Sequence, residues 1–303
     1  MKSVYGFINK REKVMKGVFL FSALFSAFAL LTIAVFLFAN GLPFIFKTGL
    51  GEFFGTNWDI MSDEKSYGIL SMIVASLYLT AISVIIGVGL GLFTAVCLYK
   101  FCPKKLVSPI RQAINLLAGI PSVIFGLFGI TVIVPFVRNY VSPTGVGEGI
   151  FSASLVLAIM ILPTVVSVSL DAMNAVPSSY YEGALALGAT KEQATFKVVL
   201  PAAKSGILAG VVLAIGRSIG ETMAVIMVIG NSPEMPHGLF QSVRTLTANI
   251  ALGAMEIRGE AEYALIATGV VLFVFTLLLT ASFSLLKEGG VKKRVKEKTN
   301  EKK

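Results

Sequence analysis

Residues 178–231 read SSYYEGALALGATKEQATFKVVLPAAKSGILAGVVLAIGRSIGETMAVIMVIGN. The first half is polar and amphipathic and lies between hydrophobic runs, whereas the second half is apolar except for Arg217 and Glu221. Charges inside an apolar run of membrane length are costly, so they usually face a protein interior or a pathway. This stretch therefore predicts a membrane protein with a polar segment outside the bilayer and a charge within it.

The composition also indicates a membrane protein. Of 303 residues, 55% are hydrophobic and 14% are charged, and the mean hydropathy is +0.81, whereas soluble domains carry about 25% charged residues. The net charge of +9 resides in tails and short loops, which argues against a nucleic-acid-binding face. Cys97 and Cys102 lack the neighbouring His or Cys pair of a metal site or disulfide framework. The sole histidine, His237, is predicted to be a solvated loop residue.

Hydrophobic runs predict an all-α polytopic protein with six transmembrane helices, because a spanning helix needs about 20 apolar residues. Five runs contain no Asp, Glu, Lys or Arg: 17–46, 66–99, 112–137, 149–170 and 263–286. A sixth run, 205–233, is interrupted only by Arg217 and Glu221. Pro121 and Pro163 fall inside two of these predicted helices, where kinks are expected.

The distribution of Lys and Arg predicts the orientation. Six spans place both termini on one side, and the segments on that side hold twenty of the 26 basic residues. The positive-inside rule then places both termini in the cytosol, in a multi-pass protein of the cytoplasmic membrane. The predicted organisation is a basic tail (1–16), a first transmembrane helix (17–39), an external loop (40–65), a core with five transmembrane helices (66–286) and a basic tail near anionic lipid (287–303). The core includes a cytosolic loop (171–204) and an external loop (234–262).

The cytosolic loop predicts a helical hairpin. Ser179 and Glu182 fit a capping box at the start of a helix of about two turns that Gly188 ends. A second capping box begins at Thr190, and Pro201 is expected to break the second helix before the next span. A compact, partly apolar hairpin on a short loop suits a partner protein, although Glu182 also has a sufficient role as a cap.

The same residues carry a family resemblance. EGA at 182–184, Gly188, and VVLP at 198–201 match the spacing of the EAA loop in permeases of ABC importers, the binding-protein-dependent transport family. The resemblance implies a type I ABC importer permease fold whose short helix docks on an ATPase subunit. It assigns six residues to this coupling loop: Glu182, Gly183, Ala184, Gly188, Leu200 and Pro201.

Other segments resemble the phosphate-specific permeases. These are 41–46 (GLPFIF), 67–76 (YGILSMIVAS), 116–129 (LLAGIPSVIFGLFG) and 217–231 (RSIGETMAVIMVIGN). GETMAV at 220–225 points to the C-type subunit. The resemblance implies phosphate as substrate, a heterodimer with an A-type permease subunit, an ATPase dimer and an external phosphate-binding protein.

The charged pair has its own geometric argument. On a continuous helix at 100° per residue, four glycines share a 120° arc that also contains or adjoins both charges: Gly206, Gly210, Gly216 and Gly220. Asn231 would fall within the same arc, and Arg217 would lie about 16–18 Å deep, near the bilayer centre. Arginine suits an oxyanion because its planar fork stays charged, so Arg217 is predicted to contact the anion and Glu221 to hold or release it. The alternative is an internal salt bridge that only stabilises the bundle. The resemblance implies that this pair belongs to the substrate pathway.

The sequence predicts a transport subunit rather than an enzyme. It contains neither the P-loop pattern G-x-x-x-x-G-K-[ST] nor G-x-S-x-G, so ATP hydrolysis is expected in a separate partner, and no cofactor or metal is predicted. One alternative is an ABC permease for sulfate, molybdate or a phosphonate. Others are an ion-coupled secondary transporter, which leaves the hairpin unexplained, and a membrane scaffold, which leaves Arg217 unexplained.

Overall fold

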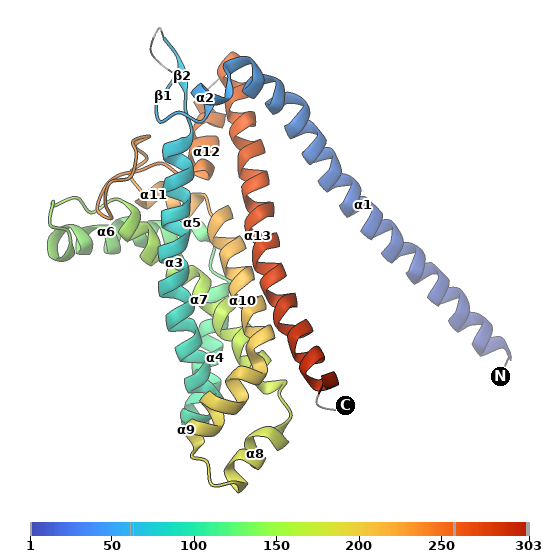
Figure 1. Cartoon of the computed structure of the whole chain (residues 1–303). Helices are drawn as coiled ribbons and strands as arrows, with labels where there is room; N and C mark the ends of the chain where they lie inside the picture. The colour runs from blue at the N-terminus through green and yellow to red at the C-terminus, as the bar shows by residue number, and fades with distance from the viewer. Residues whose placement is uncertain (1, 61, 63, 257–258, 301–303) are drawn as a thin grey trace.

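The computed structural model describes residues 2–60, 62, 64–256 and 259–300 as a bundle of long helices with a small two-stranded hairpin at one end (Figure 1). Six helical segments are long and apolar enough to cross a bilayer: Val14–Thr48, Leu70–Phe101, Ser122–Val141, Ile150–Asn174, Lys191–Gly220 and Ala261–Ser282. The predicted all-α class with six spans is confirmed.

The first two spans are α1 (Lys2–Thr48) and α3 (Leu70–Val96), and the π-helical turn η1 (Cys97–Phe101) extends α3. α1 continues nine residues beyond the predicted end at 39, so the connection to α3 is shorter than the predicted loop 40–65. It contains α2 (Leu50–Phe53) and the antiparallel strands β1 (Trp58–Asp59) and β2 (Ser66–Tyr67).

The third span begins later than predicted. α4 (Lys104–Ala118) ends before Pro121, which adopts an extended conformation with φ −59° and ψ 142°. Proline therefore separates two helices here instead of kinking one, and the predicted run 112–137 is not a single helix. The span consists of four consecutive segments: α5 (Ser122–Phe128), η2 (Gly129–Ile133), α6 (Val134–Phe136) and η3 (Val137–Val141).

α7 (Ile150–Asn174) is the most buried span, and Pro163 lies inside it. Glycines let α3 approach it closely. An added Cβ would lie 2.6 Å from Ile161 Cγ1 at Gly87 and 2.7 Å from Val165 Cγ1 at Gly91. The two helices are therefore in close contact at these two glycines, as is usual where small residues allow membrane helices to pack.

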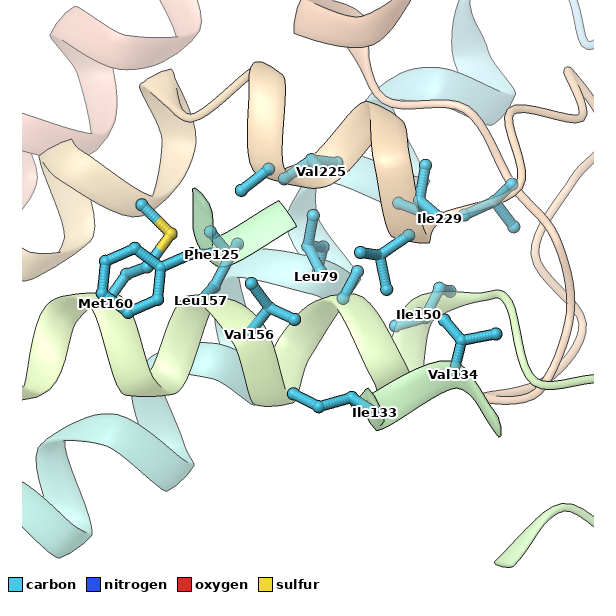
Figure 2. Close-up of a cluster of buried hydrophobic side chains, with 14 of the residues drawn as sticks. Leu79, Phe125, Ile133, Val134, Ile150, Val156, Leu157, Met160, Val225 and Ile229 are labelled. Atoms are coloured by element: carbon cyan, nitrogen blue, oxygen red, sulfur yellow. The ribbon is translucent and has the colours of Figure 1, made fainter. Parts of the chain in front are cut away.

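A buried apolar cluster joins α3, α5, α7 and α11 (Met223–Val228) (Figure 2). Its labelled members are Leu79, Phe125, Ile133, Val134, Ile150, Val156, Leu157, Met160, Val225 and Ile229. An added Cβ at Gly126 would lie 2.6 Å from Met227 Sδ, and one at Gly129 would lie 2.6 Å from Val228 Cγ2. This packing holds α11 inside the bundle.

The fifth span is continuous across Pro201. α8 (Ser178–Ala186) is followed by α9 (Lys191–Gln193), the π-helical η4 (Ala194–Val199) and α10 (Leu200–Gly220), and helix runs without interruption from Lys191 to Gly220. Pro201 is in the first turn of α10, so its missing N–H falls at the junction of π-helical and α-helical bonding. The predicted break at Pro201 is wrong.

α10 ends at Gly220, so the run 205–233 is not one helix. α12 (Leu246–Glu256) lies in the segment predicted as the external loop 234–262, and its residues Leu246 and Ala248 are buried. It packs against α3 and against α13 (Glu260–Asn300).

α1 packs against α13, and an added Cβ at Gly41 would lie 2.7 Å from Val270 Cγ2. Away from this contact α1 diverges from the bundle (Figure 1). Both termini lie toward the end of the molecule that carries α8, opposite the β1–β2 hairpin (Figure 1).

Candidate functional site

Arg217 lies in the last turn of α10, and its side chain is exposed. The glycines beside it leave open space, because an added Cβ at Gly216 or Gly220 would meet no described atom within 4 Å. Among the described residues, Arg217 forms no ion pair. A guanidinium without an ion-pair partner among the described residues therefore lies beside the open surface at Gly216 and Gly220, which we call the open glycine face.

The other half of the predicted glycine arc packs against α7. An added Cβ would lie 2.5 Å from Ala172 Cβ at Gly206 and 3.1 Å from Val168 Cβ at Gly210. The arc thus has two roles along one helix. Its first pair of glycines fixes α10 to α7, and its second pair leaves the surface around Arg217 clear.

Glu221 is not on α10 and does not pair with Arg217. Its backbone is extended, with φ −72° and ψ 127°, directly after the helix ends. Its Oε1 accepts a hydrogen bond from the backbone N–H of Ala224 at 3.2 Å, in the first turn of α11. The internal salt bridge that was the alternative interpretation is absent from the described structure, since the helix break removes the i,i+4 geometry it needs.

Asn231 also leaves the predicted arc. It occupies a left-handed turn with φ 64°, and its Nδ2 donates to the Ile226 carbonyl at 2.8 Å. Its own carbonyl accepts from Arg244 Nε at 2.8 Å. Asn231 therefore closes the turn after α11 and does not belong to the face of Arg217.

The level of Arg217 in the bundle follows from its neighbour. The hydroxyls of Ser218 and Ser83 are hydrogen-bonded at 2.8 Å, and both side chains are buried. Ser83 lies near the middle of the span Leu70–Phe101. The α10 terminus therefore lies about half-way along the second span.

The predicted helical hairpin is present at the end of the molecule farthest from the β strands (Figure 1). Gly188 has φ +86°, which is typical of a helix-ending glycine. The Gly188 N–H donates to the Leu185 carbonyl at 2.9 Å and the Ala189 N–H to the Ala184 carbonyl at 3.0 Å, the two bonds of a Schellman motif.

The two predicted capping boxes have different outcomes. At Thr190 both bonds form: Thr190 Oγ1 accepts from the Gln193 N–H at 3.3 Å, and Gln193 Oε1 accepts from the Thr190 N–H at 3.1 Å. The box of Ser179 with Glu182 is wrong. α8 begins at Ser178, so the capping position falls at Pro177, two residues before Ser179, and no side-chain cap forms.

The hairpin presents polar and apolar groups outward. Tyr181 is buried, whereas Leu187 at the tip is 90% exposed. The predicted coupling residues fall into two groups: Glu182, Gly183, Gly188 and Pro201 are exposed, and Ala184 and Leu200 are half-buried in the cluster beneath the hairpin. The hairpin is thus anchored through one side and free on the other.

A cation–π contact ties the hairpin to the second span. Lys100 Nζ lies 4.6 Å from the centroid of the Tyr181 ring and 5.3 Å from that of Tyr99. The two rings meet edge to face with centroids 6.5 Å apart. α8 therefore contacts the end of α3 as well as leading into α10.

Sequence reasoning missed the groups that surround the break at Glu221. Thr247 Oγ1 donates to the Glu221 carbonyl at 3.2 Å, and Arg244 Nη1 donates to Asn249 Oδ1 at 3.3 Å. These residues lie in the segment predicted to be an external loop. No local pattern marks Thr247, because its partner Glu221 is 26 positions away in the sequence.

Six spans, with a capped hairpin at one end and an exposed arginine at mid-depth of the bundle, define a polytopic membrane protein. The family of inner membrane components of binding-protein-dependent transport systems matches residues 87–289. The chain belongs to this family.

Curated relatives cover most of the chain. The phosphate transport system permease protein PstC of Mesorhizobium japonicum is 35% identical over 82% of this chain and 81% of its own length. The probable ABC transporter permease protein YqgH of Bacillus subtilis is 37% identical over 86% of this chain and 84% of its own length. PstC of Pasteurella multocida is 35% identical over 74% of this chain and 75% of its own length.

Solved structures of ABC importers share the fold. A chain of the inward-facing MetNI methionine transporter aligns with a TM-score of 0.59 at 20% identity, over 73% of this chain and 95% of that chain. A chain of a bacterial alginate transporter aligns with a TM-score of 0.59 at 16% identity, over 90% of this chain and 94% of that chain. The predicted ABC importer permease fold is confirmed.

Proposed function

We propose that this chain is the C-type permease subunit of an ATP-driven importer that moves inorganic phosphate across the cytoplasmic membrane. The names of the PstC relatives support the substrate. The observation that carries the proposal is Arg217, an exposed arginine without an ion-pair partner in the described chain, on an open glycine face at mid-bundle depth.

An arginine in this position suits an anion from outside the chain. A charge near the bilayer centre costs about 2.5–3.5 kcal/mol on insertion scales, and an internal carboxylate would reduce that cost. Glu221 instead bonds the Ala224 N–H. The planar guanidinium can donate two parallel hydrogen bonds to a phosphate oxygen pair, so the incoming substrate is its best partner.

Glu221 has the complementary role. In the described conformation its carboxylate accepts from Ala224 and leaves Arg217 accessible. As the pathway opens, the carboxylate moves to Arg217 and neutralises it, because opposite charges attract strongly where the dielectric constant is low. Competition between Glu221 and phosphate for the same guanidinium then lets the anion leave as the pathway opens.

The hairpin receives the force of ATP hydrolysis. Its exposed face, with Glu182, Gly183 and Leu187, docks on the ATPase subunit. From Lys191 the helix runs uninterrupted to Gly220, and the 26 residues to Arg217 span about 39 Å at 1.5 Å per residue. A displacement at the ATPase therefore reaches the anion site through one continuous helix.

The proposed assembly contains this chain, an A-type permease subunit, two ATPase copies and an external phosphate-binding protein. The hairpin and both termini lie in the cytosol, in agreement with the excess of basic residues on those segments. The β1–β2 end then faces outward. The chain itself contributes the pathway and leaves hydrolysis to its partner.

Reconstitution with the cognate ATPase and binding protein tests the function. Hydrolysis stimulated by phosphate-loaded binding protein, and not by sulfate or molybdate, is the expected result. Stimulation by another oxyanion would reassign the substrate within the family. Phosphate uptake by the chain without an ATPase would identify an ion-coupled transporter and refute the proposal.

Arg217→Gln tests the anion contact. Hydrogen bonds to charged groups contribute about 1.5–3 kcal/mol, so phosphate uptake should fall by about 10- to 150-fold. Arg138→Gln, at an exposed arginine outside the site, is the control and should retain uptake. Full uptake by Arg217→Gln would show that the arginine is not the anion contact.

A further inference from the structure

The break between α10 and α11 needs hydrogen-bond partners from elsewhere in the molecule. Helix ends leave carbonyls and N–H groups without intrahelical partners, and such groups are costly where water is scarce. Within the segment, Thr222 Oγ1 donates to the Gly220 carbonyl at 3.2 Å, and Glu221 Oε1 accepts from the Ala224 N–H at 3.2 Å. The carbonyl of Glu221 itself depends on another helix.

That partner is Thr247 of α12, 26 positions further along the chain. Its Oγ1 donates to the Glu221 carbonyl at 3.2 Å, and its side chain is 7% exposed. The hydroxyls of Thr247 and Thr245 are 3.2 Å apart. Since the single proton of Thr247 is directed to Glu221, Thr245 donates in this second bond, and its oxygen also accepts from the Ala248 N–H at 3.2 Å.

The start of α12 is fixed on two sides. The Leu246 N–H donates to Ser76 Oγ of α3 at 3.0 Å, and both residues are buried. On the other side, Arg244 bonds the carbonyl of Asn231 at 2.8 Å and the side chain of Asn249 at 3.3 Å. The first turn of α12, which carries Thr247, therefore cannot shift without breaking several buried hydrogen bonds.

We propose that Thr247 is a positioning residue that fixes the backbone at Glu221 and thereby aims its carboxylate. Arg244 supports it by holding the start of α12 against the turn after α11. The inference rests on the proposed role of Glu221 in the anion path. It assigns to α12 a part in transport, although this helix carries no residue of the predicted site.

Thr247→Val tests the proposal because valine keeps the shape and removes the donor. The peptide containing the Ala224 amide should exchange its hydrogens about five-fold faster, and maximal phosphate uptake should fall about five-fold, the effect of one ordinary hydrogen bond. Thr247→Ser should restore both values to within two-fold. The control is Thr268→Val, at a buried threonine whose hydroxyl donates to the Ala264 carbonyl of its own helix at 2.9 Å.

A double-mutant cycle with Glu221→Gln separates positioning from general stability. If Thr247 acts through the carboxylate, Thr247→Val should add nothing to the uptake loss of Glu221→Gln. Additive losses, or unchanged exchange at Ala224 in Thr247→Val, would overturn the positioning role alone. Full uptake by Glu221→Gln would overturn both the proposed path through Glu221 and the positioning role that rests on it.

Discussion

Replacing Gly188 by alanine should weaken the coupling hairpin through the backbone alone. Gly188 has φ +86°, and an added Cβ would meet no described atom within 4 Å. A left-handed conformation costs a residue with a Cβ about 1–2 kcal/mol. The closed turn, with its bonds to Leu185 and Ala184, should therefore lose about 5- to 30-fold in population relative to open forms. Asparagine tolerates this conformation better and should lose less.

The assay is the assembled importer in lipid nanodiscs. We expect phosphate-stimulated ATP hydrolysis and the affinity for the ATPase to fall in the order Gly188, Gly188→Asn, Gly188→Ala. Gly183→Ala is the matched control, because this helical glycine is exposed, has no described atom within 4 Å of an added Cβ, and stands where the EAA pattern has alanine. It should match or exceed the original chain, since alanine favours helix by about 1 kcal/mol.

Two results would refute this reasoning. Equal activity of Gly188→Ala and the original chain would show that the turn does not limit coupling. Equal damage by Asn and Ala would show that the ATPase surface excludes any side chain at Gly188, and that backbone conformation is not the cause.

Two further predictions concern α3. Gly87→Ala should destabilise the bundle by about 1–3 kcal/mol in thermal unfolding, because the added Cβ would lie 2.6 Å from Ile161 Cγ1. The control is Gly89→Ala, where an added Cβ would meet no described atom within 4 Å, and this variant should be neutral or stabilising. Equal melting temperatures of the two variants would contradict this prediction. Lys100→Gln should weaken the contact with Tyr181 by about 0.5–1 kcal/mol and should reduce the ATP hydrolysis that loaded binding protein stimulates. Lys100→Arg keeps the positive charge and should retain this hydrolysis. Equal losses in the two variants would show that the cation–π contact is not the cause.

The membrane-spanning segments could be predicted from sequence because transfer into a bilayer depends on local composition. Runs of apolar residues identified all six spans, and the spacing around Gly188 identified the hairpin and its turn. The same local reasoning failed at two prolines. Pro121 ends a helix that was expected to continue, and Pro201 continues one that was expected to end, because the neighbouring π-helical turn accommodates its missing N–H.

The candidate site could be predicted only in part. Arg217 was identified as a candidate because a charge inside an apolar membrane-length run is costly, whichever helices surround it. The angular argument for Glu221 and Asn231 assumed one unbroken helix, and the chain leaves that helix at Glu221. The hydrophobic run gives no sign of this break, since residues on both sides of it are equally apolar.

The amino-acid sequence was sufficient to identify the class of the protein, its six spans, the helical hairpin around Gly188 and the charge of Arg217 within an apolar run. The groups that Glu221 contacts and the level of Arg217 in the bundle depend on the tertiary structure. Thr247, 26 positions away, donates a hydrogen bond to the Glu221 carbonyl at the helix break. Ser83, on another helix, is hydrogen-bonded to Ser218 and so fixes where Ser218 lies along the bundle. Hydropathy and spacing are properties of neighbours along the chain, whereas a broken helix inside a membrane exists only where distant side chains satisfy its free backbone groups.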